Sequence, residues 1–228
     1  MNHRYDVGII GGGPAAIYAA YELMQLCPDA KVIMLEAGDA ISTRHCPIAD
    51  KKVNNCIKCK TCGIMRGFGG AGAFSDGKFN LTTEFGGWLN EYLPDEEVMD
   101  LIYHVDRINL QYGAPTDLFT TENSSISRLA IKHDLHLLQA KVRHLGTENN
   151  LTILKNLYEN LKDKITMCFN CQVLAIRPDQ DGFVLETAAD HGPVQCAYLI
   201  AAPGRAGSEW LAKQCRELKL HLYNNQVD

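Results

Sequence analysis

Residues 11–16 read Gly-Gly-Gly-Pro-Ala-Ala, and a run of this kind is suited to binding phosphate. A diphosphate approaches a backbone closely only where side chains are absent and where unpaired N–H groups point toward it. Gly11 permits a tight turn, Gly13 leaves room for the phosphates, and Pro14 suits the first position of a helix. Glu36 follows 25 residues after Gly11 and can accept hydrogen bonds from both hydroxyls of a ribose. This spacing predicts a dinucleotide-binding turn, and the charge of Glu36 favours FAD or NAD over NADP.

A turn of this kind works only between a strand and a helix. Residues 7–10 form an apolar run that predicts a strand, and residues 14–26 predict a helix whose positive end would face the phosphates. Residues 31–35 predict a second strand, which Glu36 closes. Ala16 stands where such turns often carry a third glycine, and its small methyl lets the helix pack closely on the strand. The unit therefore predicts a Rossmann-like α/β fold with a parallel sheet.

Four cysteines have a spacing that could bind a metal, namely Cys46, Cys56, Cys59 and Cys62. The last three stand at every third position, as in the cysteine run of iron–sulfur proteins, and the first could serve as the fourth ligand. Four thiolates would equally suit zinc, and redox-active thiols or plain surface cysteines remain open alternatives. Cys168 and Cys171 would point to opposite sides of a strand, so we expect them to pack in the core.

The composition of this 228-residue chain predicts a folded protein with small-molecule partners. Hydrophobic residues make up 46% and charged residues 21%, the formal net charge is -5, and long basic runs are absent. This excludes the electrostatic signature of nucleic-acid or anionic-membrane binding and leaves a small-molecule substrate or an electron carrier as the expected partner. The apolar stretch 7–21 is interrupted by glycine and proline and is too short to cross a bilayer. Nine cysteines without an export signal favour a cytoplasmic location.

The rest of the chain shows three patterns. Residues 66–80 are dense in glycine and lack a regular period, as expected of backbone shaped around a ligand. Residues 84–164 predict mainly helix, most clearly at 95–112 and 151–161, while residues 127–145 stay ambiguous because residues 135–138 suit either helix or strand. After these, short apolar or alternating runs separated by polar turns predict strands at 165–169, 172–176, 182–187, 194–197 and 199–202.

Three segments resemble the flavoproteins with two dinucleotide-binding domains, and more narrowly the bacterial FAD-dependent dehydrogenases. They are DVGIIGGGPAAIYAA with KVIMLEAG, the block RGFGGAGAFSDGKFN at residues 66–80, and LIAAPGR at residues 199–205. The resemblance implies an α/β fold in which residues 1–83 and 165–228 form a Rossmann-like FAD-binding domain, a parallel sheet with a β-meander. Residues 84–164 would form an inserted, mainly helical substrate or cap region.

The same resemblance implies an FAD-dependent oxidoreductase of dehydrogenase type, with NAD(H) as electron donor or acceptor. Members of the family end with a further Gly-Asp motif that covers the flavin, and no such motif follows Gly204. We therefore expect the chain to correspond to the amino-terminal half of the family fold, with the carboxy-terminal part absent. Two alternatives stay open: an incomplete nucleotide-binding fragment without its own chemistry, and a thiol-disulfide or iron–sulfur-linked flavoprotein that uses Cys56, Cys59 and Cys62.

Individual residues can be assigned to an FAD site in the same way. Val173 would meet the adenine through its backbone. Lys78 could stabilise negative charge on a reduced flavin and His144 could move a proton, so these two are the candidates for catalysis. The FAD-binding positions that the resemblance implies are Gly11, Gly13, Pro14, Ala15, Ala16, Glu36, Ala37, Gly69, Gly70, Ala71, Gly72, Ser75, Asp76, Lys78, Val173, Ala202 and Gly204.

Overall fold

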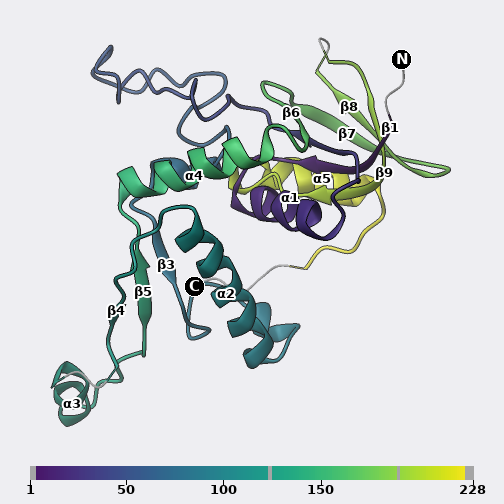
Figure 1. Ribbon diagram of the computed structural model, residues 1–228. Helices are drawn as coiled ribbons and strands as arrows, with labels where there is room; N and C mark the ends of the chain where they lie inside the picture. Colours follow the sequence, from purple (N-terminus) through teal and green to yellow (C-terminus); the bar gives the residue numbers. More distant parts are fainter. Residues whose placement is uncertain (1–3, 123–124, 189–190, 224–228) are drawn as a thin grey trace. The chain divides into compact units, whose positions relative to one another are not determined.

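The computed structural model describes residues 4–122, 125–188 and 191–223, and the chain divides into two units. The first unit contains Met1–Ala73 and Leu157–Asp228, and the second contains Phe74–Asn156. Each unit has a sheet of its own (Figure 1). Among the described residues, no helix combines the length and the apolar character needed to cross a membrane.

The first unit is built on a six-stranded, mostly parallel sheet. Its strands are β1 (Arg4–Ile10), β2 (Val32–Leu35), β6 (Thr166–Cys168), β7 (Val173–Asp179), β8 (Gly182–Thr187) and β9 (Val194–Ala201), and they lie in the order β6-β2-β1-β9-β8-β7. β1 runs parallel to both β2 and β9, and β2 runs parallel to β6. β7, β8 and β9 form an antiparallel meander. The α/β fold class expected from the sequence, a parallel sheet with a β-meander, is confirmed.

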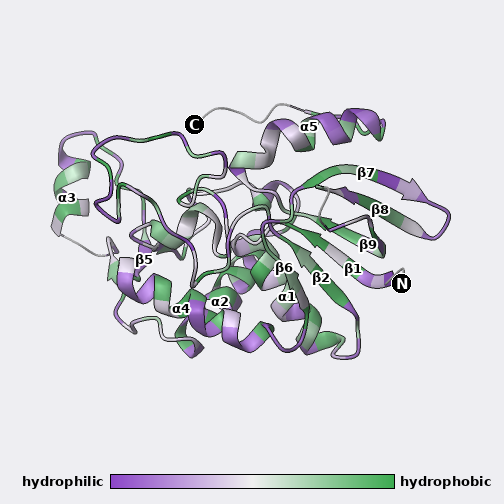
Figure 2. Ribbon diagram, turned by 90° about the horizontal axis from the view of Figure 1, so that it is seen from above, coloured by the Kyte–Doolittle hydropathy of each residue, from purple (hydrophilic) through white to green (hydrophobic). Residues whose placement is uncertain are grey.

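The strands at the centre of this sheet consist largely of buried apolar residues. All four residues of β2 are buried, and so are the last four residues of β1. Runs of this kind, without alternation of polar residues, are typical of parallel strands covered on both faces. Figure 2 shows the hydrophobic colouring of β1 and β2. Helix α1 (Pro14–Leu26) follows β1 and buries one face, which carries Ala16, Ile17, Ala20, Tyr21 and Met24.

Helix α5 (Ser208–Glu217) is fastened to β7 by two side-chain hydrogen bonds. Trp210 Nε1 donates to the carbonyl of Leu174 at 2.9 Å, and the buried side chain of Gln214 accepts from the amide of Ile176 at 2.7 Å. The short 3-10 helix η3 (Arg205–Gly207) connects β9 to α5. The turn after β9 is thus anchored at both ends.

The second unit has a three-stranded antiparallel sheet in the order β3-β5-β4. Its elements are β3 (Lys78–Asn80), η2 (Leu89–Glu91), α2 (Asp95–Gln111), β4 (Phe119–Thr120), α3 (Ser125–Lys132) and β5 (Lys141–His144). Buried Arg143 in β5 donates from Nε and Nη2 to the carboxylate of Asp106 in α2 at 2.6 and 2.7 Å, and from Nη1 to the carbonyl of Pro115 at 2.8 Å. The hydrogen bond to Asp106 raises the pKa of Arg143. This pair fastens the sheet to the helix.

Several boundaries differ from those expected. The runs 194–197 and 199–202 form one strand, β9, because pairing with β1 continues through Tyr198. Residues 84–164 contain β4 and β5 besides helices, and residues 135–138 form neither helix nor strand. The helix expected at 151–161 starts earlier, as α4 (Thr147–Leu161).

Candidate functional site

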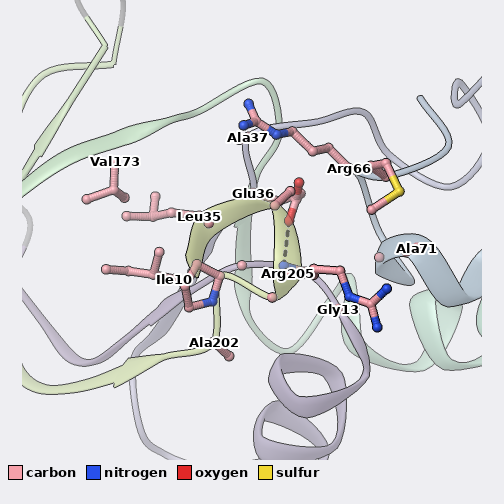
Figure 3. A pocket seen from close by; sticks show the side chains of 18 of the residues that line it. Ile10, Gly13, Leu35, Glu36, Ala37, Arg66, Ala71, Val173, Ala202 and Arg205 are labelled. Carbon is pink, nitrogen blue, oxygen red and sulfur yellow. Dashed lines mark hydrogen bonds between the residues drawn. The ribbon is translucent and has the colours of Figure 1, made fainter. Parts of the chain in front are cut away.

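A cavity of about 290 Å³ opens in the first unit where β1 ends and α1 begins (Figure 3). Glu36 and Ala37 line it from the end of β2, and Val173 lines it from the start of β7. In open α/β sheets, ligands bind outside the carboxyl ends of the parallel strands, which is where this cavity lies. The residues that line it are 10–14, 35–37, 65–66, 70–72, 171–173, 202–207 and 210.

Gly11 and Gly13 serve different purposes in the turn between β1 and α1. Gly11 has a φ of +104°, and a Cβ on it would lie 2.2 Å from the carbonyl oxygen of Ala202. Gly13 has a φ of -79°, and the nearest atom to a Cβ there would be Gly70 Cα at 3.9 Å. The fold therefore requires glycine at position 11. At position 13, no atom of the described residues requires glycine, and the space that a methyl would take borders the cavity.

The carboxylate of Glu36 is turned toward the backbone of the surrounding loops. Oε2 accepts from the amide of Gly12 at 2.6 Å, and Oε1 accepts from the amides of Gly38 and Gly67 at 2.8 and 2.9 Å. The residue is only 7% exposed. A carboxylate has about four lone-pair positions, so three bonds leave about one for a ligand. The acceptors of Glu36 are thus mostly used to hold the loops, and the expectation that it accepts both ribose hydroxyls stays a prediction.

Arg44 complements Glu36 by binding the carbonyls of the same loop. Its guanidinium donates to Gly63 at 2.8 and 3.1 Å, to Ile64 at 3.0 Å and to Phe68 at 2.7 Å. Burial lowers the pKa of Arg44, while the carboxylates of Glu36 and Asp39 raise it. The loop before the glycine-rich segment is therefore held by charged side chains rather than by a helix or strand.

Gly69 joins this loop to the β1–α1 turn. Its amide donates to the carbonyl of Gly12 at 2.7 Å, and the amide of Gly70 donates to the carbonyl of Gly67 at 2.8 Å. The resemblance implies that both residues bind FAD, but their amides are already engaged within the protein. Among the glycine-rich residues, 70–72 border the cavity and Gly69 does not.

The cavity gathers most of the FAD-binding positions expected in the first unit. Those that line it are Gly11, Gly13, Pro14, Glu36, Ala37, Gly70, Ala71, Gly72, Val173, Ala202 and Gly204. Ala16 is fully buried, in line with a role in packing, and Ala15 is exposed outside the cavity lining. Sequence reasoning did not assign Arg205 or Trp210 to the site, although both follow closely after Gly204. Their position directly after a strand-ending glycine turn is the signal that could have indicated them.

Ser75, Asp76 and Lys78 belong to the second unit, where Asp76 and Lys78 lie near His144. Asp76 Oδ2 is 2.8 Å from His144 Nε2 and 3.8 Å from Lys78 Nζ, and Lys78 pairs with His144 across β3 and β5. The hydroxyl of Ser75 accepts from the amide of Gly77 at 3.2 Å. The two candidates for catalysis, Lys78 and His144, are thus brought together around one partly exposed carboxylate, and their roles stay predictions.

The structure does not support the expected metal site. Cys46 is partly buried, Cys56, Cys59 and Cys62 are exposed, and within the described ranges no three side chains of His, Cys, Asp or Glu are grouped to hold a metal ion. The segment that carries them contains turns and bends but no helix or strand, so no regular element directs the thiols to one point. Cys171 is fully buried, as expected of a core residue, while Cys168 is partly buried.

No protein-family model matches this chain, and no curated protein sequence does. Solved structures do resemble it. Glycine oxidase from Geobacillus kaustophilus has a TM-score of 0.53 and 18% identity, and the match covers 97% of this chain and 60% of that chain. Glycine oxidase from Bacillus cereus ATCC 14579 has a TM-score of 0.50 and 13% identity, covering 92% of this chain and 58% of that chain.

A dehydrogenase has a similar fold. The 3-ketosteroid-Δ4-(5α)-dehydrogenase from Rhodococcus jostii RHA1 has a TM-score of 0.55 and 14% identity, and the match covers 90% of this chain and 46% of that chain. At these identities the likeness shows the fold alone. The class of protein that fold and cavity define is an α/β protein with a Rossmann-like sheet, and the chain spans 60% or less of the length of these structures.

Proposed function

We propose that this chain binds FAD in the cavity at the end of β1 and acts in a flavin-dependent oxidoreductase. The observation that carries the proposal is Gly13, where no protein contact requires glycine and where a side chain would enter the space in front of the first turn of α1. A glycine at such a place is explained by a ligand whose diphosphate comes close to the backbone. The names of the similar structures, two oxidases and a dehydrogenase, support redox chemistry.

The residues around the cavity fit the adenosine diphosphate part of FAD. The diphosphate would lie at Gly13, the ribose near the remaining acceptor of Glu36, and the adenine toward Val173. A volume of about 290 Å³ is at the lower end of ligand cavities, about 300 to 1,000 Å³, so it suits this half of the dinucleotide better than the whole. Bound FAD would supply hydride or electron transfer, for which the cavity offers no side chain of its own.

Equilibrium dialysis of the purified chain against FAD, FMN and NAD tests the proposal. We expect FAD to bind and ADP to compete with it, because the two share the part that the cavity fits. FMN should bind much more weakly, since it lacks the adenylate. Equal affinity for FMN and FAD, or tighter binding of NAD than of FAD, would contradict the proposed cofactor.

Redox activity needs a separate measurement, because a nucleotide-binding fragment without chemistry would pass the binding test. The flavin-loaded protein is mixed with NADH without oxygen, and loss of the visible absorbance of the flavin reports reduction. An oxidoreductase that takes electrons from NADH should lose this absorbance at a rate that saturates with NADH. A flavin that binds but is not reduced by NADH, although a strong chemical reductant reduces it, would favour the fragment alternative.

A further inference from the structure

The charged side chains around the cavity leave an excess of positive charge. Glu36, Arg66 and Arg205 are the charged residues that line it. The carboxylate of Glu36 already accepts three backbone N–H bonds. Between described residues, the ion pairs found within 4.0 Å involve neither of the two arginines. The cavity therefore offers two guanidinium groups to an anionic ligand.

The turn that carries Arg205 is held against the end of β1. The amide of Ala202 donates to the carbonyl of Ile10 at 2.8 Å, and the Ala202 carbonyl lies where a Cβ of Gly11 would be. Gly204 has a φ of +66°, a backbone conformation that favours glycine, and Arg205 follows at the first position of η3. The base of the Arg205 side chain is thus positioned by the same backbone that forms the β1–α1 turn.

Figure 3 shows that the Arg205 side chain extends toward Gly13 and Ala71, in front of the first turn of α1. That turn begins Pro-Ala-Ala-Ile, so it carries no basic side chain, and Pro14 has no N–H to donate. The helix dipole contributes only about half a positive charge, whereas a diphosphate carries about two negative charges. An anion at Gly13 would therefore lack a full countercharge unless a cation lies opposite the helix.

We propose that Arg205 binds the diphosphate of the dinucleotide from the side opposite α1. This rests on the proposed function only in that the ligand contains an adenosine diphosphate. The planar guanidinium would form two parallel hydrogen bonds to phosphate oxygens, a geometry that suits arginine better than lysine. Because the Arg205 side chain is exposed and forms no ion pair with another described residue, its removal should leave the fold intact.

Calorimetric titration of the full chain with ADP and with adenosine tests this assignment. Hydrogen bonds to charged groups contribute about 1.5 to 3 kcal/mol, so Arg205→Ala should weaken ADP binding by about 10- to 150-fold. Adenosine has no phosphate, so its affinity should stay unchanged. Arg205→Lys should recover part of the loss. Arg216→Ala, which removes an exposed arginine of α5 outside the cavity, is the matched control.

The outcomes separate this assignment from the proposed cofactor. If Arg205→Ala binds ADP as tightly as Arg216→Ala does, Arg205 does not bind the diphosphate. The same holds if the affinities of Arg205→Ala for ADP and for adenosine fall by the same factor. If the wild-type chain binds ADP but not FAD, the proposed cofactor is wrong, and the comparison of the Arg205 variants with ADP still decides the role of the arginine. A wild-type chain that binds neither nucleotide overturns both.

Discussion

Substituting Gly11 or Gly13 with alanine separates the glycine that the fold needs from the glycine that a ligand needs. In Gly11→Ala, the new methyl would lie 2.2 Å from the Ala202 carbonyl oxygen at a φ of +104°. Backbone strain of this kind costs about 1 to 3 kcal/mol, and relieving the clash with a main-chain atom costs more, so we expect at least about 3 kcal/mol of destabilisation. For a chain of this size, this corresponds to a fall in Tm of about 6 to 12 °C.

Gly13→Ala should leave the fold nearly unchanged. The φ of -79° is open to any residue, and the nearest atom to the methyl would be 3.9 Å away. Alanine reduces the entropy of the unfolded chain, which stabilises by about 0.4 to 1 kcal/mol. Alanine is also a poorer N-cap than glycine, by a similar amount, so the two effects offset. The net change in the free energy of unfolding should be within about 1 kcal/mol.

For FAD binding, unlike stability, Gly13→Ala should have the larger effect of the two substitutions. The methyl of Gly13→Ala enters the space in front of α1 and would separate a diphosphate from the backbone. Losing at least one hydrogen bond to a charged group raises the Kd for FAD by about 10- to 150-fold. Thermal melting without ligand, followed by dialysis against FAD at a temperature where each variant is folded, measures both quantities. A Gly13→Ala variant that melts as early as Gly11→Ala, or that binds FAD like the wild type, would refute the reasoning.

Three further predictions concern the groups that hold each unit together. Glu36→Gln should lower the free energy of unfolding in urea by about 2 to 4 kcal/mol, because the amide NH₂ would face a backbone N–H; exposed Glu209→Gln is the control, and equal midpoints would disprove the role of the carboxylate. Asp106→Ala should cost about 3 to 5 kcal/mol, since it leaves the buried Arg143 guanidinium unpaired; an unchanged urea midpoint would contradict this. Burial raises the pKa of Cys171 from 9.0 to about 11, so the thiol ionises at lower pH in the unfolded chain than in the folded protein. The free energy of unfolding should therefore fall as the pH rises from 9 to 11, by about 2 to 3 kcal/mol more in the wild type than in Cys171→Ser. Equal dependence of this free energy on pH in the two proteins would argue against a buried, protonated thiol.

The parts of the fold that the sequence predicts are those set by local signals that agree with one another. The apolar run before Gly11, the proline at the first helical position and the strand that ends at Glu36 all indicate the same unit, and the structure contains it. The helix expected at 95–112 is α2, and the strand expected at 182–187 is β8. In each case the residues that determine the element lie within it.

The parts that the sequence does not predict depend on contacts between distant residues. Glu36 accepts from Gly67, which lies 31 positions away, so its use as a loop anchor follows from the path of the loop and not from any local pattern. β5 carries a buried arginine in place of an apolar residue, and its distant partners, Asp106 in α2 and the carbonyl of Pro115, make that position stable. The three-residue spacing of the cysteines is a local pattern of the same limited reach, because spacing alone does not set where exposed thiols point, and among the described residues these thiols are not grouped to hold a metal ion.

The cavity wall is built so that it does not need a ligand to keep its shape. A loop without helix or strand must satisfy its backbone groups in some other way. Glu36 accepts from the amide of Gly67 in this loop, Arg44 donates to its carbonyls, and Gly69 donates to the carbonyl of Gly12. Because these bonds lie within the protein, removal of a nucleotide should leave the backbone of the β1–α1 turn in place. A nucleotide bound here would then lose little free energy to ordering the site, and we expect its affinity to depend on what remains open in the cavity, which is the space at Gly13 and the guanidinium of Arg205.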